Sequence, residues 1–151
     1  MTKKILILFF ILTMHGCGFN PVYNSSNETK YKISINEMTG DKFINNIIRD
    51  EIYKNSNNSS KEILKININT NYEKIILSKD NKGSPSEYQL IANTELEIVD
   101  NNKTTKNNFV EKQIIKNTSD SFGQKSYEEN IKENFATSIA RKFNMRLLTF
   151  K

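Results

Sequence analysis

The 151-residue sequence contains one histidine, His15, and one cysteine, Cys17, and it has no tryptophan. Beyond Cys17, therefore, the chain has no imidazole and no thiol. Nucleophilic sites of the Ser-His-Asp or Cys-His kind need these groups, and so do metal sites built from histidine or cysteine. We expect no such site, and an enzyme with this sequence would depend on carboxylate, lysine or tyrosine chemistry.

Glycine and proline are also scarce, at five and two residues. The glycines are scattered singly, so the chain lacks a glycine-rich loop of the kind that cradles phosphate groups. Two pairs of adjacent carboxylates, Asp50 with Glu51 and Glu128 with Glu129, lie in segments with helical periodicity. Such pairs are more often solvated helix faces than general acid and base pairs. The sequence predicts a protein that is not an enzyme and that needs no cofactor or metal.

Long apolar runs are missing as well. The most apolar segment, residues 5–14, is too short for a membrane-spanning helix, which needs about 20 such residues. Two lysines precede this segment, and Gly16 and Cys17 follow it closely. A positive start, a short apolar core and a small residue before the processing site are typical of a secretory signal peptide. We interpret residues 1–16 as a lipoprotein signal peptide and Cys17 as a lipidation site rather than a buried thiol.

The residues around Cys17 refine this interpretation. Met14 and His15 depart from the usual lipobox, which has leucine and then a small residue at these positions. Gly18 follows the cysteine, and a residue other than aspartate there resembles the outer-membrane address of bacterial lipoproteins. The Cys17 thiolate would carry a diacylglyceryl group and its freed amine a further acyl chain such as palmitate.

Removal of residues 1–16 leaves 135 residues (151 − 16) and lowers the formal charge from +5 to +3, because two lysines leave with them. This length suits a single domain. The mild positive charge is spread along the chain, so we expect no nucleic-acid partner. Residues 17–30 are polar and are interpreted as a lipidated N-terminus and tether. Residues 31–151 are expected to form one domain.

The first half of this domain predicts two strands around one helix. Residues 31–35 alternate between apolar and polar side chains, which indicates a strand. A turn and a helix cap follow at residues 39–41, and a helix is predicted over residues 43–55. Clean alternation over residues 62–72 predicts a long second strand, which continues to Leu77 after a bulge.

The second half predicts two further strands and a closing helix. Residues 87–98 form a third clear strand, and residues 108–117 form a less regular fourth, typical of an imperfect edge or of a strand contacted on both faces. Ser126 and Glu129 make an S-x-x-E capping box, which predicts the start of the last helix. We expect the apolar stripe of this helix, together with Met145, to lie in the core. The stripe comprises Tyr127, Ile131, Phe135, Ala136, Ile139, Ala140, Phe143, Leu147, Leu148 and Phe150.

The predicted order is therefore β-α-β-β-β-α, an α+β fold. Each strand has one apolar face, so both helices are expected on the same face of a four-stranded mixed sheet, in a two-layer sandwich. Strands two to four read as an antiparallel meander, while the pairing of the first strand stays open. The polar face of the sheet would be left to solvent or to a partner.

Residues 17–23, Cys-Gly-Phe-Asn-Pro-Val-Tyr, resemble the C-G-F-x-P-[LV]-Y opening of the LPS-assembly lipoprotein family LptE in its alphaproteobacterial form. The resemblance extends along the chain. Residues 88–100 look like the family's long middle strand, Ser126 and Tyr127 look like the start of its terminal segment, and Arg146 and Leu147 fit its closing Arg-Leu pair.

The resemblance implies a function. It implies an outer-membrane lipoprotein on the periplasmic side, whose domain plugs the β-barrel of LptD, assists its assembly and helps to deliver lipopolysaccharide to the outer leaflet. The implied partners are LptD, lipopolysaccharide and the membrane that holds the acylated Cys17. No family motif places the lipopolysaccharide contacts in this sequence, so the residues that bind it are unknown at this point.

Basic residues on or near the strands are candidates for contacts with lipid A phosphates, although each is also a normal solvated surface residue. They are Lys61, Lys65, Lys74, Lys112 and Lys116. Two other functions stay open. One is a lipid-binding auxiliary lipoprotein of a transport ATPase, and the other is a periplasmic enzyme that uses the carboxylate pairs.

Overall fold

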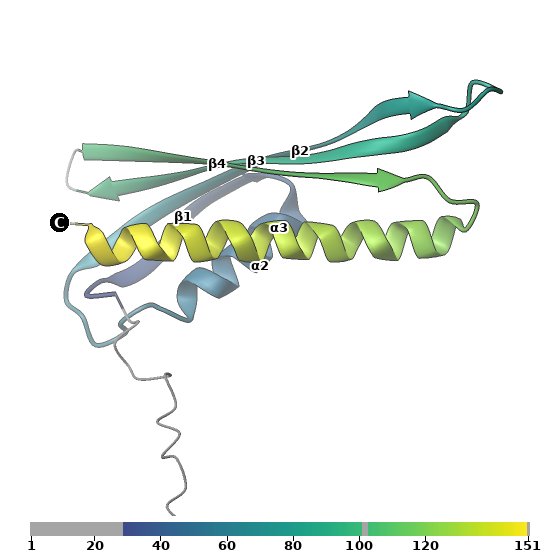
Figure 1. The fold of residues 1–151 in the computed structure, drawn as a ribbon. Helices are drawn as coiled ribbons and strands as arrows, with labels where there is room; N and C mark the ends of the chain where they lie inside the picture. The colour runs from purple at the N-terminus through teal and green to yellow at the C-terminus, as the bar shows by residue number, and fades with distance from the viewer. Residues whose placement is uncertain (1–28, 101–102, 151) are drawn as a thin grey trace, which may run out of the picture.

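The computed structural model describes residues 29–100 and 103–150. The predicted signal peptide, Cys17 and the tether up to residue 28 lie outside the described residues. Figure 1 shows two layers, in which a sheet lies on one side and both helices lie on the other. The element order is β1, α2, β2, β3, β4 and α3, so the predicted α+β architecture is confirmed.

The sheet has four strands in the order β1-β2-β3-β4. β1 (Lys32–Gly40) pairs in parallel with β2 (Ile63–Lys79), and β2 pairs antiparallel with β3 (Pro85–Asp100). β4 (Lys103–Lys116) completes the meander as an edge strand antiparallel to β3. The fourth strand was predicted to be either an imperfect edge or contacted on both faces, and the first of these alternatives is correct.

Strict alternation explains the two central strands. Leu64, Ile66 and Ile68 of β2 face the helices and are buried, as are Leu90, Leu96 and Ile98 of β3. One row of this buried face is polar, because Thr70 and Thr94 lie opposite each other and share a hydrogen bond of 2.9 Å between their hydroxyl groups. A hydroxyl pair that satisfies itself can stay in the core at little cost.

The helices cover this face. α2 (Lys42–Tyr53) begins at the N-cap Asp41, whose carboxylate accepts a hydrogen bond of 3.0 Å from the backbone N–H of Ile44, so the predicted cap is confirmed. α3 (Ser121–Thr149) runs along the sheet beside α2. The buried stripe of α3 closes the core, and its members are Ile131, Phe135, Ala136, Ile139, Ala140, Phe143 and Leu147.

Four sequence predictions about these elements are wrong. α3 begins at Ser121 and not at Ser126, because the carboxylate of Asp120 accepts the backbone N–H of Gly123 at 3.0 Å and caps the helix nearly two turns earlier. Met145 is 57% exposed, since its position on α3 falls outside the buried stripe. Tyr127 and Leu148 belong to the predicted stripe but are each 51% exposed. β1 also runs further than the predicted residues 31–35.

The chain enters the domain and ends at the same end of the sheet. Thr29 is buried and donates its backbone N–H to the carbonyl of Asn55 at 2.9 Å, so the last part of the predicted tether already belongs to the fold. The rings of Tyr31 and Phe150 meet edge to face with centroids 6.1 Å apart. The β2–β3 hairpin lies at the opposite end (Figure 1). β2 has 17 residues, which at about 3.3 Å per residue separates the two ends by about 56 Å.

Candidate functional site

A polar pocket lies at the hairpin end, between the first turns of α3 and the inner face of β2. Its volume is about 450 Å³, and it is lined by Lys74, Asn117, Thr118, Ser121, Gln124, Lys125, Glu128, Glu129 and Lys132. β1 and α2 do not extend to this end of the sheet (Figure 1). Side chains of β2 and α3 that would otherwise be covered therefore meet solvent here.

Glu128 is held at the centre of the pocket by two donors from β2. The Tyr72 hydroxyl donates to Oε1 and Lys74 Nζ donates to Oε2, each at 2.7 Å. Burial alone would raise the pKa of Glu128, but the hydrogen bonds from Lys74 and Tyr72 outweigh it, and the pKa is lowered. Burial and the bond to Glu128 raise the pKa of Tyr72. The carboxylate is therefore charged and the phenol neutral at ordinary pH, an arrangement that holds α3 against the sheet.

Lys132 connects the pocket to the start of α2. Its Nζ lies 2.6 Å from Oδ2 of Asp41, the residue that caps α2, and 4.5 Å from the centroid of the Tyr72 ring. Lys74 similarly lies 4.5 Å from the ring centroid of Tyr88. An ammonium group over an aromatic face is stabilised by the ring quadrupole. Both lysines are thus fixed in place by neighbouring rings and carboxylates.

Two side chains that line the pocket have donor groups available to bind an anion. Oε1 of Gln124 accepts from the backbone N–H of Thr118 at 3.0 Å and from its hydroxyl at 3.1 Å, while the buried Nε2 donor has no partner among the described residues. Lys125 is exposed on the next position of α3 and makes no ion pair in the part of the chain that the structure describes. A free ammonium beside an unpaired amide donor suits a phosphate or carboxylate ligand.

A second, apolar hollow lies on the other side of the same helical turns. It measures about 600 Å³ and is lined by Ile114, Ile115, Lys116, Thr118, Asp120, Gly123, Gln124 and Tyr127. Thr118 and Gln124 border both cavities. Phe122, which is 83% exposed, lies in the same first turn of α3. The polar pocket, called the basic pocket below because Lys74, Lys125 and Lys132 line it, shares a wall with this apolar hollow. Such a pair of cavities fits an amphiphile with an anionic head and an apolar tail.

The structure separates the lysines that the sequence proposed. Lys74 lines the basic pocket and Lys116 lines the apolar hollow, whereas Lys61 and Lys65 border a different cavity of about 690 Å³ at the opposite end of the sheet. Lys112 lies on β4, on the outer face of the sheet. The lysines that sequence reasoning missed are Lys125 and Lys132. Their spacing of seven residues on α3 places them on one helix face with Glu128, and that spacing was the available signal.

The carboxylate pairs are divided as well. Asp50 pairs with Arg49 and Glu51 with Lys54 on α2, while Glu128 and Glu129 lie on α3. Residues 29–100 and 103–150 contain no group of three or more His, Cys, Asp or Glu side chains placed to hold a metal ion. Among the helices of these residues, none is both long and apolar enough to cross a membrane. Cys17 lies outside the described residues, so its predicted lipidation stays a prediction.

The role of Glu128 predicts a pH-dependent effect on stability. A carboxylate whose folded pKa lies below its unfolded pKa stabilises the fold above that range, and the contribution disappears as the pH falls through the folded pKa. We expect Glu128→Gln to lower the free energy of unfolding by about 1–2 kcal/mol at neutral pH and to make little difference in strongly acidic buffer, below the lowered folded pKa of Glu128. Urea unfolding at both pH values measures this. The neighbouring Glu129→Gln is the control, because Glu129 is exposed. An equal loss at both pH values would contradict the assignment.

No family model matches the sequence, and no curated protein matches it. Solved structures do. Rare lipoprotein B from Shewanella oneidensis superposes with a TM-score of 0.58 over 76% of this chain and 95% of that chain, at 12% identity. The fold is that of solved bacterial lipoproteins. A putative lipoprotein from Caulobacter crescentus reaches a TM-score of 0.60 over 83% and 92% of the two chains at 12% identity.

An uncharacterized lipoprotein B from Nitrosomonas europaea gives a TM-score of 0.53 over 78% of this chain and 84% of that chain, at 15% identity. All three solved chains are matched over most of their own length. The likeness therefore extends over most of the domain and is not limited to a shared fragment. At these identities it concerns the fold.

Proposed function

We propose that this chain is a lipoprotein of the LptE family, of the alphaproteobacterial type. In this role it is anchored through acylated Cys17 to the periplasmic side of the outer membrane. It plugs the LptD barrel, assists its assembly and helps to deliver lipopolysaccharide to the outer leaflet. It catalyses no reaction.

The observation that carries the proposal is the agreement between two independent features of the chain. Residues 17–23 resemble the opening of the LptE lipoproteins, and the described residues have the fold of rare lipoprotein B and other solved lipoproteins. The first feature lies in the predicted tether and the second in the packed domain. Neither depends on the other, so their agreement is stronger support than either alone.

The shape of the domain suits this role. The outer face of the sheet carries polar side chains such as Asn67, Glu97 and Lys106, which form a ladder across neighbouring strands. A polar face is compatible with the lumen of a large outer-membrane barrel, which is also polar. Acyl chains on Cys17 would hold the other end at the membrane, since each buried CH₂ contributes about 0.8 kcal/mol.

The two cavities suit the implied ligand. Lipid A of lipopolysaccharide combines phosphate groups with acyl chains, and the basic pocket and the apolar hollow share the wall formed by Thr118 and Gln124. In this proposal Lys125 and the free Gln124 amide contact a phosphate, and Ile114, Ile115 and Tyr127 contact an acyl chain. The site lies at the hairpin end of the domain, opposite the end where the described chain begins (Figure 1).

Charge reversal at Lys125 tests the ligand assignment. We expect Lys125→Glu in the full-length protein to weaken binding of purified lipopolysaccharide by roughly three- to tenfold, because a phosphate would then face a carboxylate. Lys61→Glu is the matched control, since Lys61 is an exposed lysine beside the cavity at the opposite end. Equal binding of lipopolysaccharide by the two variants would contradict the assignment of this pocket as the phosphate site.

Co-purification tests the proposed partner. The tagged chain, isolated from membranes of its own cell in detergent, is expected to carry LptD in comparable amount. Recovery of an inner-membrane transport ATPase in place of LptD would overturn the proposal and favour the auxiliary lipoprotein function instead.

A further inference from the structure

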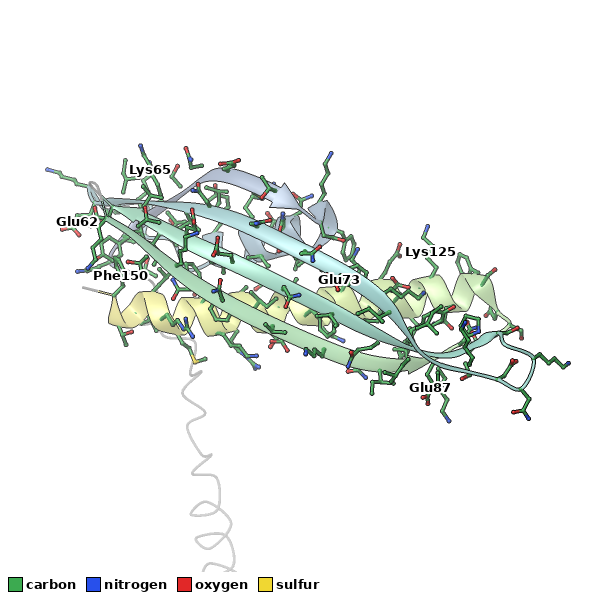
Figure 2. All side chains as sticks on the ribbon, turned by 90° about the horizontal axis from the view of Figure 1, so that it is seen from above. Glu62, Lys65, Glu73, Glu87, Lys125 and Phe150 are labelled. Carbon is green, nitrogen blue, oxygen red and sulfur yellow. The ribbon has the colours of Figure 1, made fainter. Side chains whose placement is uncertain are left out.

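β2 loses its neighbour half-way along the sheet. The last residue of β1, Gly40, pairs with Thr70, and the N–H of Asp41 donates to the Thr70 carbonyl at 2.8 Å before the chain turns into α2. β2 continues to Lys79 with β3 on its other side only. Figure 2 shows β2 running on beyond the end of β1, with Glu73 in this part. Over residues 71–79, no described strand pairs with the backbone groups that point away from β3.

This free edge is apolar at its centre. Ile75, Ile76 and Leu77 follow one another and are 43%, 47% and 48% exposed. An open edge of this kind invites pairing with another strand. The other edges of the sheet are less open, because the backbone N–H groups of Ile33 and Ile35 in β1 donate to the hydroxyl groups of Ser56 and Tyr53, and β4 carries lysines along its length. These lysines are Lys103, Lys106, Lys112 and Lys116.

We propose that residues 73–79 of β2 pair antiparallel with the same residues of a second copy of this chain, around a two-fold axis at Ile76. The charges select this register. With Ile76 opposite Ile76, Glu73 of each copy lies opposite Lys79 of the other, and Ile75 lies opposite Leu77. A shift that places the axis between Ile76 and Leu77 would instead oppose Lys74 to Lys79, and like charges across strands are destabilising.

The proposed pair also fits the shape of the edge. Because the copies run in opposite directions, the β1 strands and α2 helices lie at the two far ends of the joined sheet and do not meet. Residues 73–79 of one copy end before the position opposite Thr70, where β1 stops. The register shifts of β2 against β3, between Ile76 and Ser78 and between Ser78 and Lys79, lie on one side of the axis in each copy, so the two-fold operation places them symmetrically.

A contact of this size is smaller than a standard protein interface, and we expect a dissociation constant in the micromolar range. Two copies anchored to one membrane surface would pair more completely, since the anchor raises their effective concentration. We expect this dimer for the chain that is bound to no other partner. It does not depend on LptD or on lipopolysaccharide, so its test is independent of the proposed function.

Charge exchange tests the register. Full-length protein in detergent micelles is expected to show a concentration-dependent monomer–dimer equilibrium in sedimentation velocity. Glu73→Lys places lysine opposite lysine at both ends of the pairing and should weaken the dimer by about tenfold. The double change Glu73→Lys with Lys79→Glu restores both opposite-charge pairs and should restore the dimer. A monomer at every concentration up to about 200 µM, or a double variant as weak as the single one, would overturn the proposal.

Cysteine cross-linking is a second test of the proposed dimer, and it does not require a measured dissociation constant. Ile76→Cys places two thiols at the two-fold axis, so mild oxidation should give a disulfide-linked dimer on a non-reducing gel. Val110→Cys is the matched control, because Val110 is 52% exposed on the outer face of β4. The unsubstituted chain shows any contribution from Cys17. Equal dimer yield from Ile76→Cys and Val110→Cys would refute pairing through this edge.

Discussion

Replacing Phe143 with alanine should lower the free energy of unfolding by about 3–5 kcal/mol. Phe143 is fully buried on α3, and its ring meets that of Phe109 on β4 edge to face, with centroids 6.4 Å apart. The change leaves a cavity between the helix and the sheet, where the surrounding core residues relax only in part. Because a domain of this size has a total stability of about 5–15 kcal/mol, the variant should lose a large part of its stability.

Phe122→Ala is the matched control for this prediction. Both residues are phenylalanines of α3, but Phe122 is 83% exposed. Its loss should change the free energy of unfolding by no more than about 0.5 kcal/mol. Urea unfolding followed by circular dichroism compares the two variants. Similar losses from both would mean that α3 does not pack on the sheet through the face described here.

Gly40→Ala should be nearly as damaging, with a loss of about 3 kcal/mol or more. Gly40 has a φ of +85°, and an added Cβ would lie 1.9 Å from the carbonyl oxygen of Thr70. That oxygen accepts the backbone N–H of Asp41, so it cannot move without loosening the end of β1 and the start of α2. A single methyl group therefore acts on two elements at once.

Gly83→Ala separates the backbone conformation from the steric clash. Gly83 has a similar φ of +80°, but nothing lies within 4 Å of its added Cβ. Only the cost of the left-handed conformation applies, about 1–2 kcal/mol. Thermal unfolding of the two variants should therefore show the larger drop for Gly40→Ala. If Gly83→Ala were equally destabilising, the close approach of Gly40 to Thr70 would not be the cause.

Periodicity predicted the fold where one face of an element is buried along its whole length. β2 and β3 alternate strictly over the stretches that the helices cover, and every inward apolar residue expected there from Leu64 to Ile68 and from Leu90 to Ile98 is buried. Asp41 was identifiable as a cap because it directly precedes a helical stripe. Local pattern failed at the start of α3, where Ser126 offered a good capping box inside a helix that Asp120 had already begun.

Periodicity also failed for residues whose environment depends on how far a neighbouring element extends. Tyr127 continues the predicted apolar stripe of α3 but borders the apolar hollow beside β4, and it is half exposed. The early end of β1 relative to β2 produces both the basic pocket and the free edge of β2. No local pattern in residues 32–40 shows that β2 extends beyond the end of β1, since strand pairing is a long-range property.

The candidate site was predictable only in part. Lys74 was among the expected basic residues, but it was grouped with Lys61 and Lys65, which lie at the opposite end of the sheet. Lys125 and Lys132 were overlooked because only lysines near strands were considered. The contact of Glu128 with Tyr72 spans 56 positions of the chain, a distance over which spacing carries no information.

The fate of LptD tests the central claim most directly. In the native cell, this protein is depleted while LptD is followed by non-denaturing electrophoresis. If the chain is the LptE-type partner, LptD should fail to reach its mature form as the protein disappears, and re-expression should restore it. Normal maturation of LptD in cells that lack the protein would contradict the proposed function.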